Sequence, residues 1–342
     1  SAKFRETTIE KFWQNRNQQA KSQVQRDGTM HTVFDVEKEK KVSIIIPTKN
    51  KLNLITNCIH GLLNKTAYQN IEIIIVDTGS TDVEVLAYYD TLLSDSKIKF
   101  VKYLKPFNYS AACNMGANAA SAKLLLFLNN DTEVQHTSWL TEMVRSAMQP
   151  GVGVVGPKIL YPSGALQSAG VFIGPFLAAL AYREAYAEQW TVFGSPQHHR
   201  NTLSTMGCCQ MITREAFLRV NGFDEKYQIA HSDTAICLNI WQAGYRIVYN
   251  PYSRIVHLEG SSRGSTNPDP DNQRLANEIF LLGIFYDPYF HPELNAQDAI
   301  PKVRLAHELK DSDGLAFYTA YMGGPKATDV IDVDLFNLGS IL

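Results

Sequence analysis

The sequence contains no apolar run long enough to cross a membrane. Its longest candidate, Val171–Tyr182, falls short of the roughly 18–20 residues that a spanning helix needs and is interrupted by Gly174 and Pro175. We expect no signal peptide, and neither internal repeats nor low-complexity tracts occur. The formal net charge is only −2 over 342 residues, so bulk charge gives no indication of a nucleic-acid partner.

Cysteine is scarce, and its spacing is not that of a metal site. The chain has five cysteines, an odd number, and three of them, Cys58, Cys113 and Cys237, fall among apolar helical positions. We therefore expect buried free thiols rather than a disulfide framework. Such thiols fit a reducing compartment, so we expect the protein to be cytoplasmic.

Three apolar runs are present, and each ends in polar residues. They lie within residues 42–50, 71–80 and 124–133, and their polar ends are Thr48–Asn50, Asp77–Ser80 and Asn129–Asp131. Between the first two, Leu52–Asn64 has apolar residues at helical spacing, so the unit predicts a strand, a helix and a parallel strand. Open α/β sheets bind ligands at the carboxyl ends of their strands, and a carboxylate there can hold a divalent cation on a phosphate. We therefore predict a nucleotide site at this edge. A simple polar turn is the alternative for the last segment taken alone.

The segments around this unit are less strongly patterned. Residues 1–40 are polar, and Ile9, Phe12 and Trp13 could form the apolar face of a helix that packs on the main domain, with a partner-binding arm as the alternative. Further elements are predicted as helices over 137–148, 236–243 and 271–285 and as strands over 151–161 and 246–256. Residues 162–201 are irregular and rich in aromatics, which suggests an acceptor loop. The adjacent histidines in it, His198 and His199, are not expected to share one metal ion.

Taken in order, the motifs of this chain resemble those of a family-2 glycosyltransferase of the GT-A fold. They are SIIIPTKN, IIIVDTGSTD, FNYSAACNMGANAA, LLLFLNNDTEV, VGVVGPKILYPSGALQSAG, GCCQMITREAFLRVNGFDE, HSDTAICLNIWQAGYRIVYNPYSRIVH and LEGSSRG. The resemblance extends over roughly Lys41 to Gly264, about two thirds of the chain. It implies an α/β fold with a Rossmann-like, mostly parallel central sheet flanked by helices. The implied domains are a helical arm at 1–40, a GT-A domain at 41–265 divided into a nucleotide-binding half (41–134) and an acceptor half (135–265), and a helical extension at 266–342.

In the resembling family, residues at these strand ends and in a late loop bind the nucleotide. The matching positions here are Pro47, Thr48, Asn50, Asp77, Ser80, Asn114, Asn129, Asn130 and Arg263. The resemblance places Asp77 on a uracil or thymine ring, with a helix N-cap as the alternative. Asn114 matches a residue near the nucleotide sugar, again with helix capping as the alternative. Arg263 lies in a Gly/Ser loop that could close over the diphosphate as a lid or could be a plain surface loop.

The metal motif of the family, Asp-x-Asp, is Asn129-Asn130-Asp131 in this chain. Asn129 brings no charge, so Asp131 is expected to be the main carboxylate on a Mg²⁺ or Mn²⁺ ion, with diphosphate and water completing the octahedron. His257 matches the late histidine ligand of the family, and an imidazole favours Mn²⁺. The metal would stabilise the charge on the departing diphosphate.

The general base of the family corresponds to Asp233, for which an N-cap of the following helix is the alternative. The family has a second acid two positions later, where this chain has Ala235. Gly207 is expected to allow close backbone approach to the sugar, with Cys208 and Ser232 beside it in the sugar or acceptor pocket.

The resemblance implies an inverting transferase in which the base deprotonates an acceptor hydroxyl that attacks the anomeric carbon directly. The implied donor is a UDP- or dTDP-sugar and the implied acceptor a glycan or lipid-linked glycan, as in bacterial enzymes of surface polysaccharides and O antigen, rhamnosyltransferases among them. Peripheral association with the inner membrane and attachment to other domains are compatible with this. The alternative of a catalytically weak nucleotide-sugar-binding domain within a larger synthase stays open, because two acids of the family motifs are missing from this chain. A nucleotidyltransferase would need a Gly-rich, basic first loop, and PTKNKLN is a poor match to one.

Overall fold

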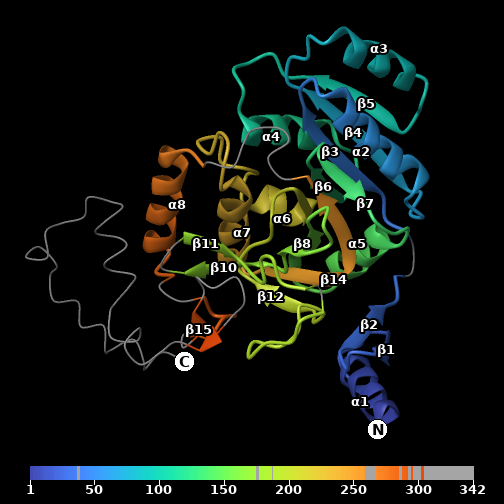
Figure 1. Cartoon of the computed structure of the whole chain (residues 1–342), viewed down its shortest axis with the longest axis vertical. Coiled ribbons are helices and arrows are strands. Elements are labelled where there is room, and N and C mark those ends of the chain that lie inside the picture. The colour runs from blue at the N-terminus through green and yellow to red at the C-terminus, as the bar shows by residue number, and fades with distance from the viewer. Residues whose placement is uncertain are drawn as a thin grey trace, which may run out of the picture.

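The computed structural model describes residues 1–36, 39–174, 177–186, 188–258, 267–284, 287–291, 294–295 and 302–303. Within these ranges the centre of the molecule is a mixed sheet of ten strands (Figure 1). Its strand order is β12-β14-β8-β13-β6-β3-β4-β5, with β7 paired to β14 and β9 paired to β8.

The first half of the sheet is parallel, as the strand–helix–strand pattern predicts. β3 pairs in parallel with both β4 and β6, and β4 pairs in parallel with β5. All residues of β3, β4 and β6 are buried, because helices cover both faces and continuous Ile, Val and Leu runs suit that environment. The bounds are β3 (Val42–Thr48), β4 (Ile71–Asp77), β5 (Ile98–Lys102) and β6 (Leu124–Leu128).

The second half is joined to the first through an antiparallel strand. β13 pairs antiparallel with β6 on one side and with β8 on the other, and β14 then pairs in parallel with β8. The short strands β7, β9 and β12 extend this half at its edges. The bounds are β7 (Thr132–Val134), β8 (Val152–Leu160), β9 (Leu166–Ser168), β12 (Arg200–Thr202), β13 (Cys209–Thr213) and β14 (Arg246–His257).

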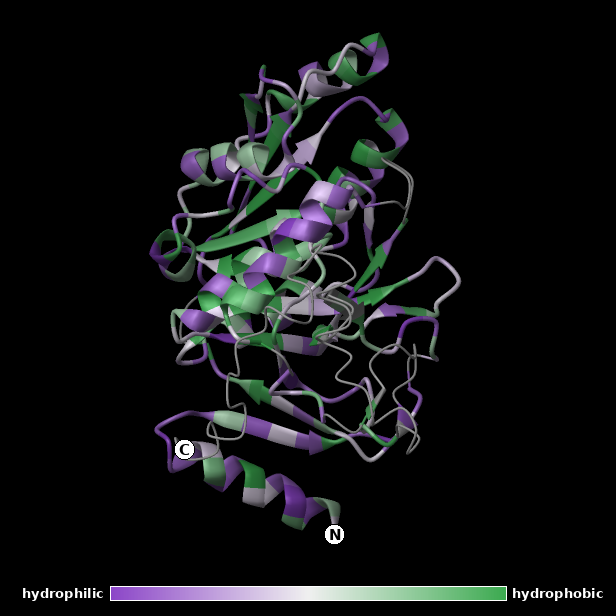
Figure 2. Cartoon of the chain, turned by 90° about the vertical axis from the view of Figure 1, so that its left-hand side faces the viewer, coloured by the Kyte–Doolittle hydropathy of each residue, from purple (hydrophilic) through white to green (hydrophobic). Residues whose placement is uncertain are grey.

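Helices form a layer on each face of the sheet. Alternate strand residues point to opposite layers, so Ile44 packs in one apolar cluster and Ile45 in the other. The first cluster includes side chains from α2 (Leu52–Asn64), α3 (Val83–Leu92) and α5 (Trp139–Ala147), and the second includes side chains from α4 (Tyr109–Ala119), α6 (Arg214–Arg219) and α7 (Ser232–Gln242). A further helix, α8 (Asp269–Leu281), packs beside α7. Figure 2 shows the apolar strands enclosed between these helices.

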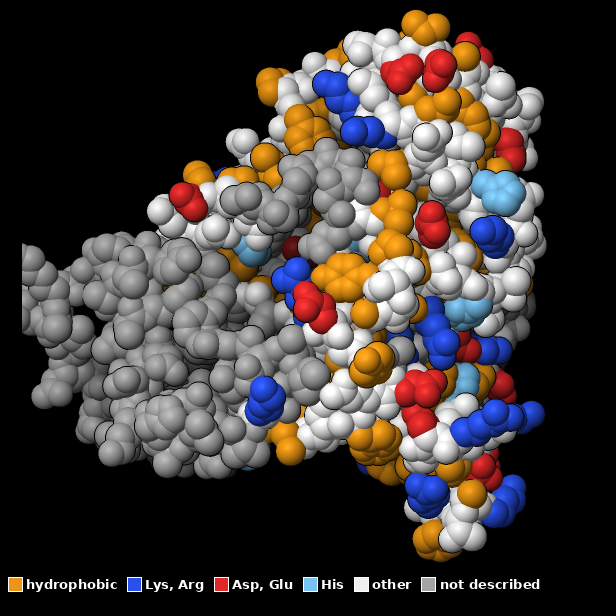
Figure 3. Space-filling model, viewed as in Figure 1, with side chains coloured by type: hydrophobic (Ala, Val, Ile, Leu, Met, Phe, Trp, Pro, Cys, Tyr) orange, Lys and Arg blue, Asp and Glu red, His pale blue; other side chains and the backbone are white. Residues whose placement is uncertain are grey.

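The N-terminal segment is a helix on a β-hairpin, which projects from the body of the molecule (Figure 1). The predicted helix is present as α1 (Ala2–Gln14), but β1 (Ala20–Val24) and β2 (Met30–Phe34) were not predicted. Both strands are short, and their sequences lack a clear alternation of apolar residues. Figure 3 shows side chains of both charges over this arm.

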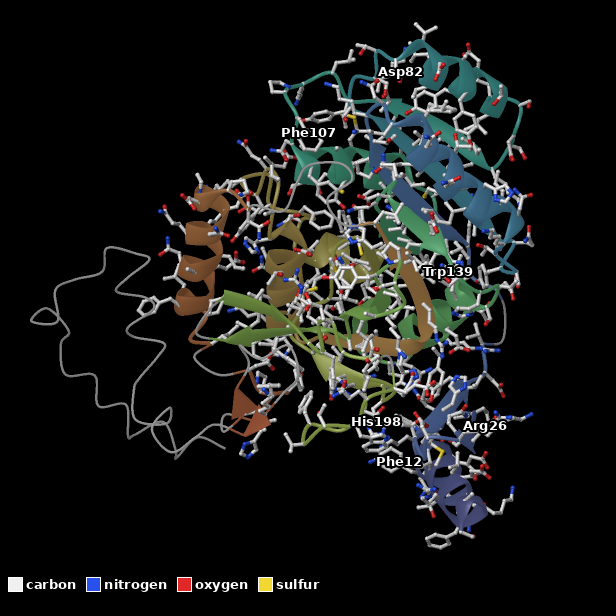
Figure 4. The ribbon with its side chains drawn as sticks, viewed as in Figure 1. Phe12, Arg26, Asp82, Phe107, Trp139 and His198 are labelled. Carbon is white, nitrogen blue, oxygen red and sulfur yellow. The ribbon has the colours of Figure 1, made fainter. Side chains whose placement is uncertain are left out.

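The arm contacts the main domain through the second strand of its hairpin. The imidazole of His31 stacks on Tyr252 with ring centroids 3.6 Å apart, and its Nε2 lies 3.3 Å from Glu142 of α5. The loop that contains His198 lies beside the arm residues Phe12 and Arg26 in Figure 4, and the next residue, His199, stacks on His31 at 6.4 Å. We therefore find the arm packed on the main domain rather than detached from it.

Several predicted elements are confirmed, and others need correction. The helix over 52–64 agrees to the residue, and the helices over 137–148 and 271–285 correspond to α5 and α8 with small shifts at their ends. The helix expected over 236–243 begins earlier, at Ser232. The irregular segment 162–201 contains β9 and a hairpin of β10 (Val171–Gly174) and β11 (Leu177–Leu180), with β12 beginning at its end. A last small pair joins β15 (Leu294–Asn295) to β16 (Lys302–Val303).

All five cysteines are buried free thiols, as expected. In the part of the chain that the structure describes, no helix is both long and apolar enough to span a membrane.

Candidate functional site

The three predicted strand ends converge at the carboxyl edge of the parallel sheet. Thr48 at the end of β3 is in register with Asp77 at the end of β4. Asn130, just beyond β6, donates a hydrogen bond from its side chain to the Thr48 hydroxyl at 2.9 Å. Pro47 is buried within β3, opposite Val76. A single edge therefore brings together polar groups from three strands.

Side chains from both loops fix the turns after β3 and β4 to each other. The amide oxygen of Asn50 accepts the backbone N–H groups of Thr81 and Asp82 at 2.8 and 3.0 Å. The backbone N–H of Asn50 in turn donates to the Ser80 hydroxyl at 2.9 Å. Asn50 adopts the left-handed conformation (φ 52°), which Asn tolerates better than most residues. The two loops thus form one preorganised rim.

Asp77 is part of this rim and does not cap a helix. Its carboxylate accepts the backbone N–H of Ser80 at 3.0 Å, and the residue is 8% exposed. Helix α3 is capped instead by Asp82, at its start in Figure 4, whose carboxylate accepts the N–H of Glu84. The N-cap alternative for Asp77 is therefore wrong, because the chain makes a further turn before the helix begins.

Asp131 and His257 are brought together although they are far apart in the sequence. Asp131 follows β6 and His257 is the last residue of β14, which pairs with β7 directly after Asp131. The Nε2 atom of His257 lies 3.3 Å from Oδ1 of Asp131. Both side chains are nearly buried, at 9% and 2% exposure. The pair supplies one imidazole nitrogen and one carboxylate at the same edge.

Gln167 is a member of this group that the sequence analysis did not single out. Its amide oxygen lies 3.0 Å from Nδ1 of His257, on the side of the ring opposite Asp131. Gln167 is fully buried in β9. The only sequence signal is its place within the motif ILYPSGALQSAG, since a glutamine between a leucine and a serine predicts no contact with a histidine 90 residues away.

Asp233 lies in the first turn of α7, where backbone N–H groups hold its carboxylate. One oxygen accepts the N–H of Gly207 at 2.7 Å, and the other accepts the N–H of its neighbour Thr234 at 2.8 Å. The N-cap position belongs to His231, so the N-cap alternative for Asp233 is wrong in position. Ser232 beside it is buried.

Gly207 has no room for a side chain. A Cβ atom at Gly207 would lie 2.7 Å from Cβ and 2.8 Å from Oδ2 of Asp233. This is closer than non-bonded carbon and oxygen atoms approach. The close approach seen here is to Asp233, and the expected close approach of the backbone to the sugar stays a prediction.

Cys208 lies near both Asp131 and Asp233 at this edge of the sheet. Burial raises the pKa of its thiol well above the ordinary value, and the nearby Cys209, Asp131 and Asp233 raise it further. The thiol is thus neutral and a poor nucleophile. The backbone oxygen of Cys208 accepts the N–H of Asn129 at 2.9 Å, which joins β13 to the end of β6.

Asn129 accepts a hydrogen bond from the hydroxyl of Tyr109 at 3.1 Å through its side-chain oxygen. Burial of that hydroxyl raises the Tyr109 pKa well above its usual value, and Cys113 and Asp233 are among the groups that raise it further. Tyr109 is therefore a neutral donor that orients the amide of Asn129 at the edge of the site.

The side chain of Asn114 is engaged within the protein. Asn114 lies in the middle of α4, where its side chain donates to the carbonyl of Phe223 and accepts from the N–H of the same residue, both at 2.9 Å. The capping alternative is wrong because Asn108 caps α4. Arg263 lies outside the described residues.

The donor set at Asp131 and His257 suits a cation that also takes ligands from its substrate. In the described ranges, no group of three or more His, Cys, Asp or Glu side chains gathers closely enough to hold a metal ion. A carboxylate and an imidazole are ligands that Mn²⁺ accepts, and its remaining positions can be filled by phosphate oxygens and water.

The sequence of this chain is similar to those of known proteins. Residues 43–220 match the family model described as "Glycosyl transferase family 2". The chain is 35% identical over 301 residues to "O-antigen biosynthesis protein RfbC" of Myxococcus xanthus, an alignment that covers 87% of this chain and 23% of that protein. It is 33% identical over 271 residues to "Uncharacterized protein y4gI" of Sinorhizobium fredii, which covers 77% of this chain and 30% of that protein. The chain therefore spans less than a third of the length of these two relatives.

Solved structures show the same fold at low sequence identity. The crystal structure of GalNAc-T7 with UDP, GalNAc and Mn²⁺ aligns with a TM-score of 0.58 and 19% identity over 74% of this chain and 50% of that one. The mannosyltransferase PcManGT of Pyrobaculum calidifontis, in complex with GDP-Man and Mn²⁺, aligns with a TM-score of 0.50 and 16% identity over 85% of this chain and 78% of that one. Both are glycosyltransferases of the GT-A fold, and the central sheet here has that architecture.

Proposed function

Because this chain belongs to glycosyl transferase family 2, we propose that it transfers a sugar from a UDP- or dTDP-sugar to a hydroxyl group of a glycan or lipid-linked glycan. The observation that carries the proposal is the gathering of Asp131, His257 and Asp233 at the carboxyl edge of one sheet, beside the rim made by Asn50 and Asp77. Similarity to a protein of O-antigen biosynthesis supports a role in making a bacterial surface polysaccharide.

In this proposal the rim receives the nucleotide. The partly exposed Asn50 and Ser80 surround the buried Asp77 carboxylate, which can accept a hydrogen bond from a pyrimidine N–H. Thr48, Asn129 and Asn130 extend the polar edge towards the diphosphate. Arg263 would contact the diphosphate from its loop. Asn114 is the weakest member, because its amide is already bonded to Phe223.

Asp131 and His257 would hold a divalent cation, Mn²⁺ or Mg²⁺, on that diphosphate. When bound, the ion stabilises the negative charge of the leaving group. Both of the solved neighbours described above contain Mn²⁺. The residues here fit such an ion, since both side chains are buried at the edge and the second ring nitrogen of His257 is engaged by Gln167.

Asp233 would act as the general base of a single, inverting displacement. The N–H groups of Gly207 and Thr234 fix its carboxylate, and it is only partly buried, so an acceptor hydroxyl can reach it. The nearby Cys208 thiol is neutral, which disfavours a covalent intermediate on sulfur. Gly207, Cys208 and Ser232 would line the sugar and acceptor pocket.

A catalytically weak binding domain is the second candidate, motivated by Asn129 and Ala235. One observation weakens it. Ala235 is 2% exposed and packs in an apolar cluster with Tyr227 and Leu238, so an acid at this position would face the core of this chain rather than the acceptor. The lack of an acid there therefore need not reduce activity.

We place the protein in the cytoplasm, at the inner face of the membrane when its acceptor is lipid-linked.

Binding and turnover test the proposal separately. In a thermal-shift screen of UDP, dTDP, GDP and CMP with Mn²⁺, Mg²⁺ or EDTA, a ligand at 100 times its Kd should raise stability by about 2.7 kcal/mol. We expect a metal-dependent shift with UDP or dTDP that Asp131→Ala abolishes and Asp233→Asn retains. With a donor found in this way, Asp233→Asn should lower turnover at least ~100-fold. A domain that binds nucleotide but releases no nucleoside diphosphate with any acceptor would favour the second candidate, and no shift with any nucleotide would refute both.

A further inference from the structure

Gln167 occupies an irregularity in the pairing of β9 with β8. Leu166 is opposite Leu160 and Ser168 is opposite Ile159, so the register shifts at Gln167, which has no partner of its own. Such bulges redirect a side chain away from the regular alternation of a strand. Here the redirected side chain is fully buried and reaches His257.

The hydrogen bond to His257 is the feature that gives this amide a role. The Oε1 atom of Gln167 lies 3.0 Å from Nδ1 of the ring, and Nε2 of Gln167 is buried with no hydrogen-bond partner among the described residues. An amide oxygen can only accept, so this contact requires the proton of His257 to be on Nδ1. In the neutral ring the Nε2 lone pair is then directed at Asp131, 3.3 Å away.

A lone pair and a carboxylate that face each other at this distance repel unless a cation lies between them. We propose that Gln167 is a positioning residue that fixes His257 in the Nδ1–H tautomer and so prepares Nε2 and Asp131 for the divalent cation. The inference deepens the proposed function, on which it rests. Outer partners of this kind set the orientation of a ligating histidine and change metal affinity by about 10–100-fold.

The opposite orientation of the amide makes a different prediction. If Nε2 of Gln167 faced the ring, it would donate to Nδ1, and the ring proton would lie on Nε2 and be donated to Asp131. The geometry of the heavy atoms is the same in both cases. The tautomer of His257 therefore decides between them.

The tautomer can be measured directly in the metal-free protein. We would label histidine with ¹⁵N and record long-range ¹H–¹⁵N spectra at about pH 8, where an ordinary imidazole is neutral, and assign His257 by comparison with His257→Asn. We expect the Nδ1–H pattern in the native protein and in Gln167→Glu, which keeps an acceptor oxygen. Gln167→Leu should shift the ring towards the Nε2–H form. An Nε2–H pattern in the native protein, or an unchanged pattern in Gln167→Leu, would overturn the inference.

Metal affinity provides the second readout. Mn²⁺ titration followed by electron paramagnetic resonance should give a Kd that rises about 10–100-fold in Gln167→Leu and recovers in Gln167→Glu. Gln197→Leu is the matched control, because it removes another buried glutamine whose partner is Lys158. Equal loss of affinity in both leucine variants would show a general loss of structure and refute the specific role. Neither measurement uses donor or acceptor, so failure of sugar transfer would not alter these results.

Discussion

Among single residues, Gly207 shows how far the site depends on the close approach of backbone. Its N–H donates to the Asp233 carboxylate at 2.7 Å, and the space that a side chain would occupy is filled by that carboxylate. Gly207 is important because it has no side chain. Its effect on Asp233 can be tested without removing any polar group from the site.

We predict that Gly207→Ala lowers kcat about 100-fold and leaves nucleotide binding unchanged. The added Cβ must displace the proposed base, and a shift of about 1 Å in a catalytic group costs on this order. Initial rates and nucleotide titrations would measure both effects. Gly61→Ala is a suitable control, because its Cβ would meet only the side chain and backbone of Val134, at 3.2 Å or more. Unchanged kcat in Gly207→Ala would contradict the role given to Asp233.

The residues of the site could be predicted from the sequence only where a motif identified them. Recognisable motifs contain Asp131, Asp233 and His257. In the structure these residues lie at one edge of the sheet. Gln167 could not be predicted, because its partner is 90 residues away and its direction depends on a bulge. The capping alternative for Asn114 was wrong for a similar reason, since its side chain bonds to Phe223 across 109 residues.

At the scale of elements, a buried carboxylate holds the amino-terminal end of the sheet together. Glu72 of β4 is 3% exposed and accepts hydrogen bonds from Ser43 at 2.6 Å and Lys99 at 2.9 Å. Lys41 and the backbone N–H of Ser121 also donate to it. Burial alone would raise the Glu72 pKa, but these hydrogen bonds outweigh it and hold the pKa well below the usual range.

We predict that Glu72→Ala lowers the free energy of unfolding at neutral pH by about 2–4 kcal/mol, because it leaves buried donors without a partner. A carboxylate whose pKa is lower in the folded state stabilises the protein above its unfolded pKa, and this contribution disappears as pH falls. The difference between native and variant protein should therefore shrink below about pH 4.5. Denaturant unfolding across this range would measure it, with the exposed Glu84→Ala as control. A constant difference would contradict the account of Glu72.

The elements most accurately predicted are those with a strong apolar period. Helix α2 matched the prediction to the residue, because its apolar face packs on the sheet. The start of α7 was missed because the polar residues His231, Ser232 and Asp233 look like a loop, whereas the helix begins among them. The β1–β2 hairpin was missed because its strands show no regular apolar alternation and pack against α1 and α5.

For the molecule as a whole, the pH dependence of stability should reveal a buried lysine outside the site. Lys158 of β8 has no exposed surface and donates to Gln197. Burial, with Arg254 nearby, lowers its pKa to about 7. The folded protein therefore binds fewer protons than the unfolded chain between about pH 7 and the ordinary lysine pKa of 10.5.

We predict that the stability advantage of Lys158→Met over the native protein is largest at and below about pH 7. Above pH 7 the lysine is protonated in the unfolded chain but not in the folded protein. The free energy of unfolding of the native protein, minus that of the variant, should therefore rise by about 1.4 kcal/mol per pH unit above pH 7. Changes from other titrating groups are common to both proteins and cancel in the difference. Urea unfolding of both proteins at several pH values would measure the slope. If the difference in free energy of unfolding between the two proteins did not change with pH, Lys158 would stay charged when buried.

The fold as a whole could be predicted because the motifs occur in family order, but its sheet is more mixed than the parallel pattern suggests. Antiparallel β13 between β6 and β8 has no distinct sequence signal, since a buried central strand is apolar in either direction. The chain spans only 23% and 30% of the length of two of its relatives.

The most direct test of the central claim is a crystal structure with Mn²⁺ and the nucleoside diphosphate that gives the largest thermal shift. We predict a manganese anomalous peak within roughly 2.2 Å of both the Asp131 carboxylate and Nε2 of His257, with the diphosphate on the ion, the base against Asp77, and Asp233 facing the open side. Nucleotide bound away from this edge, or manganese bound without Asp131 and His257, would contradict the account.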